Sequence, residues 1–322
     1  MKAIVQDSYG DSSTLRYADV DRPVPKNDEV LVRVAATSLH IGDWHLMTGL
    51  PLVARAALGM RAPKSRIRGM DVAGTVLELG ADVSGFAVGH AVFGIGEGGL
   101  AEFTRASASS IVHMPAGLDF AQASALPTSG TTALHALRDA GGVQAGQKVL
   151  VVGASGGVGI YAVQLARAFG ALVTAVCSTS KMELMRSLGA SEVIDRSRED
   201  FTSTGERFDL VVDMVSSQPL ARLRSVLTPR GTLVIVGGEG GSRFLGGLTR
   251  PLGASVTSPL RSQTQRGLVS VTRAADLQTL ADLAEAGKIV PVIDSSYPLS
   301  RGVEAMRRLE SRAAVGKIIA TP

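Results

Sequence analysis

The stretch KVLVVGASGGVGIYAVQLARAFG, residues 148–170, joins two patterns of secondary structure through a group of glycines. Residues 148–154 form a short aliphatic run, typical of a parallel strand buried on both faces. Beyond the glycines, apolar residues recur with helical spacing until Gly170 ends the pattern; they are Val158, Ala162, Leu165, Ala166 and Phe169. ALVTAVCS, residues 171–178, predicts a second strand, so the whole stretch is a βαβ unit.

The glycines of this turn predict a binding site for a dinucleotide. Gly156 and Gly159 remove side chains where a pyrophosphate would approach and where the helix packs on the strand. Backbone N–H groups at the helix start then face the anion. A tight turn without a ligand can also contain glycines, but the place between strand and helix favours the dinucleotide. The expected contacts are Ala154 (in place of the first glycine of G-x-G-x-x-G), Ser155, Gly156, Gly157, Val158 and Gly159.

The end of the second strand favours NADPH over NADH. An acidic residue is expected about 20 residues past the glycines where a ribose 2′-hydroxyl is bound. The sequence there is CSTSK, residues 177–181, without Asp or Glu. Ser178, Thr179 and Lys181 offer hydroxyls and a positive charge that suit a 2′-phosphate. Ser180 and Glu183 fit a capping box for the next helix, and we assign Ser180 to that role.

Strands and helices continue to alternate, which predicts a doubly wound parallel sheet over residues 124–262. Such sheets bind ligands at the carboxyl ends of their strands. Arg196 follows one strand and suits stacking on adenine, although an exposed arginine there needs no ligand. The remaining contacts expected at strand ends are Val215, Ser216, Gly237 and Gly238.

Composition excludes several classes of protein. The chain has 322 residues, 45% of them hydrophobic, and this length suggests two domains. The single cysteine, Cys177, rules out a disulfide framework and a cysteine-based structural zinc lobe. A net charge of +4 on scattered basic residues, with 4% aromatic residues, argues against nucleic-acid binding. No long apolar run predicts a membrane span, and MKAIVQDSYG predicts a strand rather than a signal peptide, so we expect a cytoplasmic location.

Residues 1–123 follow a different pattern. Short strands separated by Gly, Pro and Asp predict an antiparallel β unit. The C-terminal residues 291–321 predict an extended segment, a helix and a closing strand that returns to this unit. We therefore expect one domain from residues 1–123 and 263–322, and a second from residues 124–262.

The segments GDWHLMTG (42–49), RGMDVAGTV (68–76), GHAVFG (89–94), GASGGVG (153–159) and GKII (316–319) occur in an order that resembles the medium-chain dehydrogenase/reductase superfamily. They resemble in particular its zinc-independent quinone oxidoreductase and enoyl reductase-like branch. The resemblance implies a Rossmann-type sheet combined with a GroES-like antiparallel β domain. It also implies a homodimeric enzyme that uses NADPH to reduce small hydrophobic quinones or activated carbonyl compounds.

Some members of that superfamily hold a catalytic zinc ion and others do not. In this chain, the residues at the positions that match the zinc ligands argue against zinc. They are His40, Met70, Asp71 and Thr128. Methionine is a poor zinc ligand and threonine is not a usual one. His40 and His45 lack a third partner at metal-binding spacing, which favours structural histidines. We expect no metal site.

The resemblance also implies catalytic residues. Thr132 matches a threonine near the nicotinamide, although a β-branched residue at a helix start is an equal alternative. Relatives usually have Asn-Pro-x-Asp where this chain has HIGD, His40 to Asp43, and often a tyrosine soon afterwards as a candidate proton donor. No tyrosine follows here, so protonation falls to water or His40. Quinone oxygens take protons from solvent, and the missing tyrosine therefore favours quinones or small enones. The candidate catalytic residues are Thr132, His40 and Asp43.

Some questions stay open at this point. The arginine-rich segments 49–69 and 240–267 suit a lid over a hydrophobic substrate, a lipid-contacting surface or a solvated loop. Two other functions also remain. One is a zinc-type alcohol dehydrogenase, which Met70 and Thr128 argue against. The other is an NADPH-binding regulatory or partner protein with little turnover.

Overall fold

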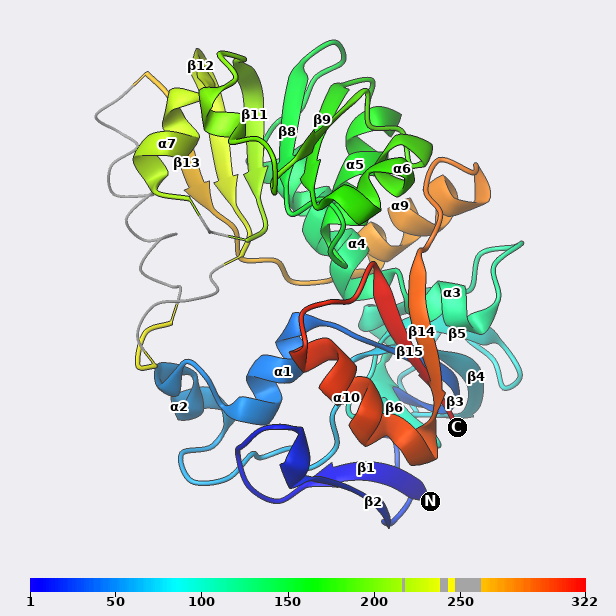
Figure 1. The fold of residues 1–322 in the computed structure, drawn as a ribbon. Helices are drawn as coiled ribbons and strands as arrows, with labels where there is room; N and C mark the ends of the chain where they lie inside the picture. Colours follow the sequence, from blue (N-terminus) through cyan, green and yellow to red (C-terminus); the bar gives the residue numbers. More distant parts are fainter. Residues whose placement is uncertain (216–217, 238–242, 247–261) are drawn as a thin grey trace. The chain divides into compact units, whose positions relative to one another are not determined.

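A computed structural model describes residues 1–215, 218–237, 243–246 and 262–322 (Figure 1). The chain divides into two compact units. Unit 1 comprises Met1–Thr131, Thr272–Gly287 and Pro291–Pro322, and unit 2 comprises Thr132–Val271 and Lys288–Val290. We predicted boundaries after residues 123 and 262, whereas these divisions follow residues 131 and 271. The first division falls inside helix α4 (Pro127–Leu134), so no loop marks it in the sequence.

Unit 2 is built on a parallel sheet, which confirms the predicted doubly wound α/β architecture. The strand order is β10-β9-β8-β11-β12-β13. The order changes direction between β8 and β11, and sheets of this kind bind ligands at the carboxyl ends of the strands beside such a point. The strands are β8 (Lys148–Val152), β9 (Leu172–Cys177), β10 (Glu192–Asp195), β11 (Phe208–Asp213), β12 (Leu227–Ile235) and β13 (Thr264–Gly267). The helices are α5 (Gly159–Ala168), α6 (Met182–Ser187) and α7 (Leu220–Ser225), and a π-helical segment (His135–Ala140) continues α4.

Helix α5 is more deeply buried than its periodicity predicts. Residues 159–166 are all buried, including Tyr161 and Gln164, which lie off the predicted apolar face. Gln164 forms two hydrogen bonds with the backbone of Val290, at 2.8 and 3.0 Å, so a segment from far along the chain covers that side. The helix ends at Ala168, and Gly170 follows it as predicted with a φ of +81°. The N–H groups of Gly170 and Ala171 donate to the last carbonyls of the helix, the pattern of a Schellman motif.

Unit 1 contains a seven-stranded sheet in the order β14-β15-β3-β4-β5-β7, with β6 paired to β3. Only β14 and β15 are parallel among its pairs in the described residues. The strands are β3 (Glu29–Leu39), β4 (Asp71–Leu79), β5 (Ala91–Ile95), β6 (Phe103–Ser107), β7 (Ile111–His113), β14 (Ile293–Pro298) and β15 (Lys317–Thr321). A separate pair consists of β1 (Lys2–Gln6) and β2 (Leu15–Asp19). The helices are α1 (Ile41–Thr48), α2 (Arg55–Leu58), α3 (Phe120–Ser124), α9 (Ala274–Glu285) and α10 (Gly302–Glu310).

The C-terminal strand β15 pairs with β3, so the end of the chain returns to the N-terminal sheet as predicted. On the other side of β3, strand β4 begins at Asp71, and the register places Asp71 opposite Ser38. The first residue of β15, Lys317, and the first residue of β4 therefore lie near the same end of β3. Residues more than 240 positions apart in the sequence meet there.

Candidate active site

The turn between β8 and α5 depends on glycine at three positions, for different reasons. Gly153 has a φ of +82°, a left-handed conformation that side chains rarely adopt. A Cβ atom at Gly159 would lie 2.3 Å from the carbonyl oxygen of Gly153, which prevents the helix from packing on the strand. A Cβ atom at Gly156 would have that oxygen, at 3.5 Å, as its one neighbour within 4 Å among the described residues. The space over Gly156 is open, as a ligand that approaches the backbone requires.

The first turn of α5 presents backbone N–H groups that the protein leaves unengaged. The N–H groups of Ala154 and Gly156 donate to the carbonyl oxygens of Val176 and Gly153, at 3.1 and 3.2 Å. Those of Gly157, Val158 and Gly159 donate to no group in the described part of the chain. The positive end of the helix dipole lies at the same place. This turn therefore fits the diphosphate of a dinucleotide. Ala154 and Gly156, two of the expected contacts, already use their N–H groups within the protein.

Asp195, at the end of β10, engages one of the residues that we expected to bind a 2′-phosphate. The hydroxyl of Thr179 donates to Asp195 Oδ2 at 2.5 Å. Hydrogen bonds from Ser197 and Thr179 lower the pKa of Asp195 to about 2, so this carboxylate keeps its charge. The side chains of Ser178 and Lys181 make no hydrogen bond or ion pair with the residues that the structure describes. Ser178 and Lys181 thus remain open to a ligand, while Thr179 binds within the protein.

Three positive charges gather at the end of β9. Lys181, Arg186 and Arg196 all act electrostatically on the thiol of Cys177, the last residue of this strand. Burial, the largest influence, raises the pKa of that thiol, and Asp195 adds to the effect. A phosphate beside Lys181 and Arg196 would meet positive charge from two neighbouring loops.

The predicted capping box of Ser180 with Glu183 is wrong. A 3-10 turn, Thr179–Lys181, leads directly into α6, and the N-cap of that helix is Lys181, with no side-chain hydrogen bond to the helix. Glu183 pairs with Arg186 instead. Because Ser180 lies inside the turn, its side chain is exposed and joins the polar groups after β9.

Two further expected contacts follow the neighbouring strands β11 and β12. Val215 is exposed beyond the end of β11. A Cβ atom at Gly237 would lie 2.0 Å from the carbonyl oxygen of Met214, so the two strand ends approach too closely for any other residue. Ser216 and Gly238, expected at the same place, lie outside the described residues.

In unit 1, the HIGD segment forms the start of α1, with His40 as the N-cap. The backbone N–H of His40 donates to Asp43 Oδ2 at 3.0 Å, and the N–H of Gly42 donates to His40 Nδ1 at 3.0 Å. A Cβ atom at Gly42 would lie 2.6 Å from the imidazole, so glycine lets the ring fold over the helix start. Because Nδ1 accepts a hydrogen bond, Nε2 carries the proton of the neutral ring.

The Nε2 atom of His40 is buried and has no hydrogen-bond partner in the described residues. Only 8% of the His40 side chain is exposed. Nε2 lies 3.5 Å from Asp43 Oδ2 and 3.9 Å from Asp71 Oδ1. Buried polar atoms of this kind are uncommon and point to a bound group or a chemical role. We predicted a structural histidine as the better interpretation, and the unpartnered nitrogen favours a functional one.

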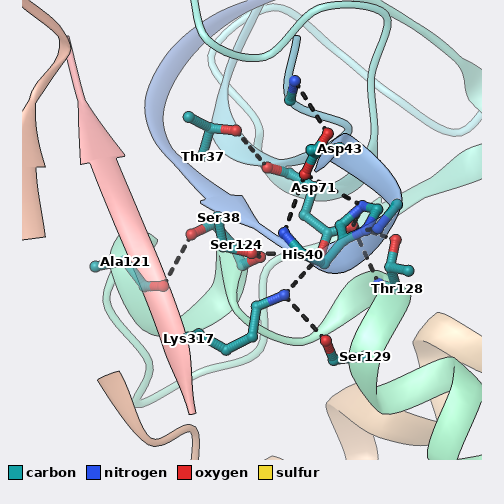
Figure 2. Close-up of polar contacts among 12 residues, drawn as sticks. Thr37, Ser38, His40, Asp43, Asp71, Ala121, Ser124, Thr128, Ser129 and Lys317 are labelled. Atoms are coloured by element: carbon teal, nitrogen blue, oxygen red, sulfur yellow. Dashed lines mark hydrogen bonds and ion pairs between the residues drawn. The ribbon is translucent and has the colours of Figure 1, made fainter. Parts of the chain in front are cut away.

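A buried ion pair lies beside this imidazole (Figure 2). Lys317 Nζ donates to Asp71 Oδ2 at 3.3 Å and to Ser129 Oγ at 3.0 Å. The backbone N–H and the hydroxyl of Thr128 donate to Asp71 Oδ1, at 3.1 and 2.5 Å. The side chains of Lys317 and Asp71 are 1% and 0% exposed. Strands β4 and β15 thus hold the first turn of α4 through one carboxylate and one ammonium group.

These residues do not fit a zinc ion. At the positions that match zinc ligands, Asp71 pairs with Lys317, the Thr128 hydroxyl donates its proton to Asp71, and Met70 supplies a thioether. A lysine ammonium beside the Asp71 carboxylate repels a divalent cation. Among the described residues, no three His, Cys, Asp or Glu side chains form a group that could hold a metal.

Two features of the 49–69 segment could not be predicted. Tyr9, from far earlier in the chain, reaches it: the Tyr9 hydroxyl donates to Gly59 O at 2.8 Å, and the Arg55 guanidinium lies 4.3 Å from the Tyr9 ring centre. His45 Nδ1 donates to Leu50 O at 2.8 Å, and burial lowers the pKa of His45. The hydrogen bond and the burial of His45 favour the structural interpretation of this residue.

The cations of this segment are mostly used within the protein. Arg66 pairs with Asp7, Arg68 is buried, and Arg55 stacks on Tyr9. In the second arginine-rich segment, Arg266 donates to the carbonyl oxygen of Ala140 at 2.8 Å. Most of residues 240–261 lie outside the described residues.

Thr132 lies in α4, one turn after Thr128, and is half-buried. Its neighbour Thr131 is fully buried, and the Thr131 hydroxyl has no hydrogen-bond partner in the described residues. Of the two threonines, Thr132 is the more accessible, and its catalytic role stays a prediction.

The chain is similar to known oxidoreductases over its whole length. Residues 26–116 match the alcohol dehydrogenase GroES-like domain, and residues 188–319 match the zinc-binding dehydrogenase family. The chain is 34% identical to the chloroplast envelope quinone oxidoreductase homolog of Arabidopsis thaliana, over 100% of this chain and 98% of that protein. It is also 34% identical to 2-methylene-furan-3-one reductase of Solanum lycopersicum, over 100% of this chain and 79% of that protein. The quinone oxidoreductase from Coxiella burnetii has 30% identity and a TM-score of 0.87, over 100% of this chain and 99% of that one.

With its Rossmann-like parallel sheet and GroES-like antiparallel sheet, the chain belongs to the medium-chain dehydrogenase/reductase superfamily, and the predicted fold class is confirmed. Within this superfamily it lies in the quinone oxidoreductase branch. No helix in the described ranges is long and apolar enough to span a bilayer. The cytoplasmic location stays a prediction.

Proposed function

We propose that this oxidoreductase binds NADPH and reduces quinones or α,β-unsaturated carbonyl compounds by hydride transfer. The observation that carries the proposal is the set of unengaged N–H groups at the start of α5, next to the open space over Gly156. Gly157, Val158 and Gly159 bind the diphosphate, and Ser155 flanks it. Val215 and Gly237, at the ends of β11 and β12, border the same cofactor, and Thr132 contacts its nicotinamide.

The choice of NADPH rests on the groups after β9. Ser178 and Lys181 bind the 2′-phosphate, since both side chains are unengaged within the described residues. Arg196 adds a second cation from the loop after β10 and stacks on the adenine. Thr179 contributes by holding this loop through Asp195 rather than by binding the phosphate.

The protein's part in the reaction is to orient the substrate and to stabilise the charge that develops on its oxygen. When bound, NADPH would supply a hydride to the β-carbon of an enone or to a quinone. The Nε2–H of the neutral His40 ring donates a hydrogen bond to the carbonyl oxygen on which negative charge develops, and solvent protonates the resulting enolate at its α-carbon. Asp43 holds the imidazole through the start of α1. Reduction of a quinone depends less on His40, because solvent can protonate the hydroquinone oxygens.

We propose that this reaction proceeds without zinc, because Lys317, Thr128 and Met70 provide no metal site beside Asp71.

We also propose that the protein forms a homodimer. Strand β13 lies at the edge of its sheet in the described residues, and Val269 and Val271, just after it, are 89% and 63% exposed. Exposed apolar residues next to an open strand edge favour association with a second chain.

The test is NADPH oxidation by the purified protein with a panel of quinones, enones, enoyl thioesters and aldehydes. We expect turnover with quinones and small enones that a chelator leaves unchanged. Alcohol oxidation that a chelator abolishes would support a zinc-type alcohol dehydrogenase instead. Tight NADPH binding without turnover of any compound would support a regulatory or partner protein.

A further inference from the structure

The Nε2 atom of His40 lies near two carboxylates, those of Asp43 and Asp71 (Figure 2). It forms a hydrogen bond with neither. Other donors occupy each carboxylate. Asp43 accepts from the backbone N–H groups of His40 and Gly69, at 3.0 and 3.1 Å. Asp71 accepts from Thr128 on one oxygen, and from Lys317 and the Ser38 hydroxyl on the other, both at 3.3 Å. These donors hold both carboxylates, and the imidazole N–H has no hydrogen-bond partner in the described residues.

Lys317 is the one cation that pairs with Asp71 in the described residues. Without it, Asp71 would be a buried carboxylate with no positive charge beside it, which is strongly unfavourable. The nearest group that can compensate is the His40 ring, with Nε2 at 3.9 Å from Asp71 Oδ1. A small movement of either side chain would form that hydrogen bond and would use the proton of Nε2.

We propose that Lys317 is a positioning residue that keeps the Nε2–H of His40 available to the substrate by holding Asp71 in place. The inference rests on the proposed function, in which His40 donates to a carbonyl oxygen. Lys317 itself does not touch the substrate in this account. Its ammonium acts on the neighbouring imidazole through the shared carboxylate of Asp71.

The experiment compares Lys317→Met with the double variant Lys317→Met/Asp71→Asn. Methionine keeps the length of the side chain and removes the charge. We expect Lys317→Met to lower kcat for an enone about tenfold or more and kcat for a quinone less than threefold. The loss for the enone stays below the roughly hundredfold or greater loss of a removed donor, because the His40 ring itself remains. The double variant removes the carboxylate's charge as well, so its ratio of enone to quinone turnover should return toward that of the natural protein. Lys148→Met, which breaks an exposed ion pair with Glu206 at 2.8 Å, is the control and should leave the ratio unchanged.

A purely structural role of Lys317 predicts a different result. Both activities would then fall in parallel, and the double variant would not restore their ratio; either outcome overturns the proposal. If Lys317→Met fails to fold, the double variant alone tests the proposal. Its ratio of enone to quinone turnover must then stay near that of the natural protein, and a changed ratio would overturn the proposal.

A measurement without turnover separates this inference from the proposed function. In nitrogen NMR of the histidine rings, with His40 assigned through His40→Gln, we expect an Nε2 proton in the natural protein without the downfield shift of a hydrogen bond to a carboxylate. Lys317→Met should give a downfield Nε2 proton, and the double variant should lose that shift. Unchanged signals would overturn the role of Lys317. If the natural protein reduces neither enones nor quinones, the proposed function is wrong. The NMR measurement still tests the effect of Lys317 on the Nε2 proton of His40.

Discussion

The hydroxyl of Thr179 donates to the carboxylate of Asp195 over 2.5 Å and thereby ties the loop after β9 to the loop after β10. Ser197 binds the other oxygen of Asp195 through its N–H at 3.0 Å and its hydroxyl at 2.5 Å. These two loops carry Lys181 and Arg196, the cations that we assign to the cofactor. The position of the phosphate site therefore depends on a charged residue that does not itself bind phosphate.

This arrangement predicts a pH-dependent contribution to stability. The pKa of Asp195 is lowered to about 2, below that of an aspartate in an unfolded chain. The unfolded state therefore binds more protons in acid, so the contribution is present above about pH 4 and is lost as the pH falls toward 2. Asp195→Asn should be less stable than the natural protein in urea at pH 7, and the difference should shrink toward zero by about pH 2. A difference that persists unchanged at pH 2 would show that the charge of Asp195 contributes nothing.

Lys181→Ala tests the choice of cofactor. Because a charge-assisted contact to phosphate contributes roughly 1.5–3 kcal/mol, NADPH affinity should fall about tenfold to a hundredfold while NADH affinity hardly changes. Fluorescence titrations with both cofactors measure this. Lys148→Ala, at the opposite end of β8, serves as the control and should change neither affinity. Equal losses for NADPH and NADH would contradict the phosphate assignment.

Metal analysis tests the assignment of Lys317, Thr128 and Asp71 to a metal-free site. The purified protein should contain no stoichiometric zinc by mass spectrometry, and a chelator should leave its NADPH-dependent turnover unchanged. Stoichiometric zinc together with loss of turnover on chelation would show that the ion pair of Asp71 opens to admit a metal.

The edge of the parallel sheet tests the proposed homodimer. Val269→Glu places a charge on an 89% exposed valine just after β13, so the fold should be unaffected while association weakens. Light scattering should show a dimer for the natural protein and a larger share of monomer for the variant. Val24→Glu, at an exposed valine in unit 1, should remain dimeric. A natural protein that is monomeric at all concentrations would contradict the proposal.

Local patterns in the sequence were sufficient to predict the parallel sheet, the glycine turn and the return of the C-terminal strand. The alternation of apolar strands with helices and the glycine positions report directly on backbone geometry, so elements such as β8 and α5 were expected. The capping box at Ser180 failed because a 3-10 turn continues into α6, and a spacing of three residues fits both arrangements. Burial on all sides of α5 was not predicted, because it depends on Val290.

The contacts between the buried polar side chains around Asp71 in unit 1 could mostly not be predicted from the sequence. His40, Asp43, Asp71 and Thr128 were noticed through the resemblance, but Lys317 was not. Its partner Asp71 lies 246 residues away in the chain, and only the pairing of β15, β3 and β4 brings them together. The one available signal was a lysine at the start of an otherwise apolar strand, GKII, where an unpaired charge would be costly to bury.

The most direct test of the central claim, that the turn before α5 binds NADPH, is a titration of Gly156→Val with NADPH alongside a thermal melt. The structure has room for a side chain at Gly156, so the variant should melt close to the natural protein yet lose NADPH affinity by at least a hundredfold. Two glycine variants provide controls. Gly159→Ala should unfold more easily because its Cβ meets the backbone, and Gly170→Ala should lose about 1 kcal/mol of stability at a φ of +81° while binding NADPH normally. Normal NADPH binding by folded Gly156→Val would contradict the account.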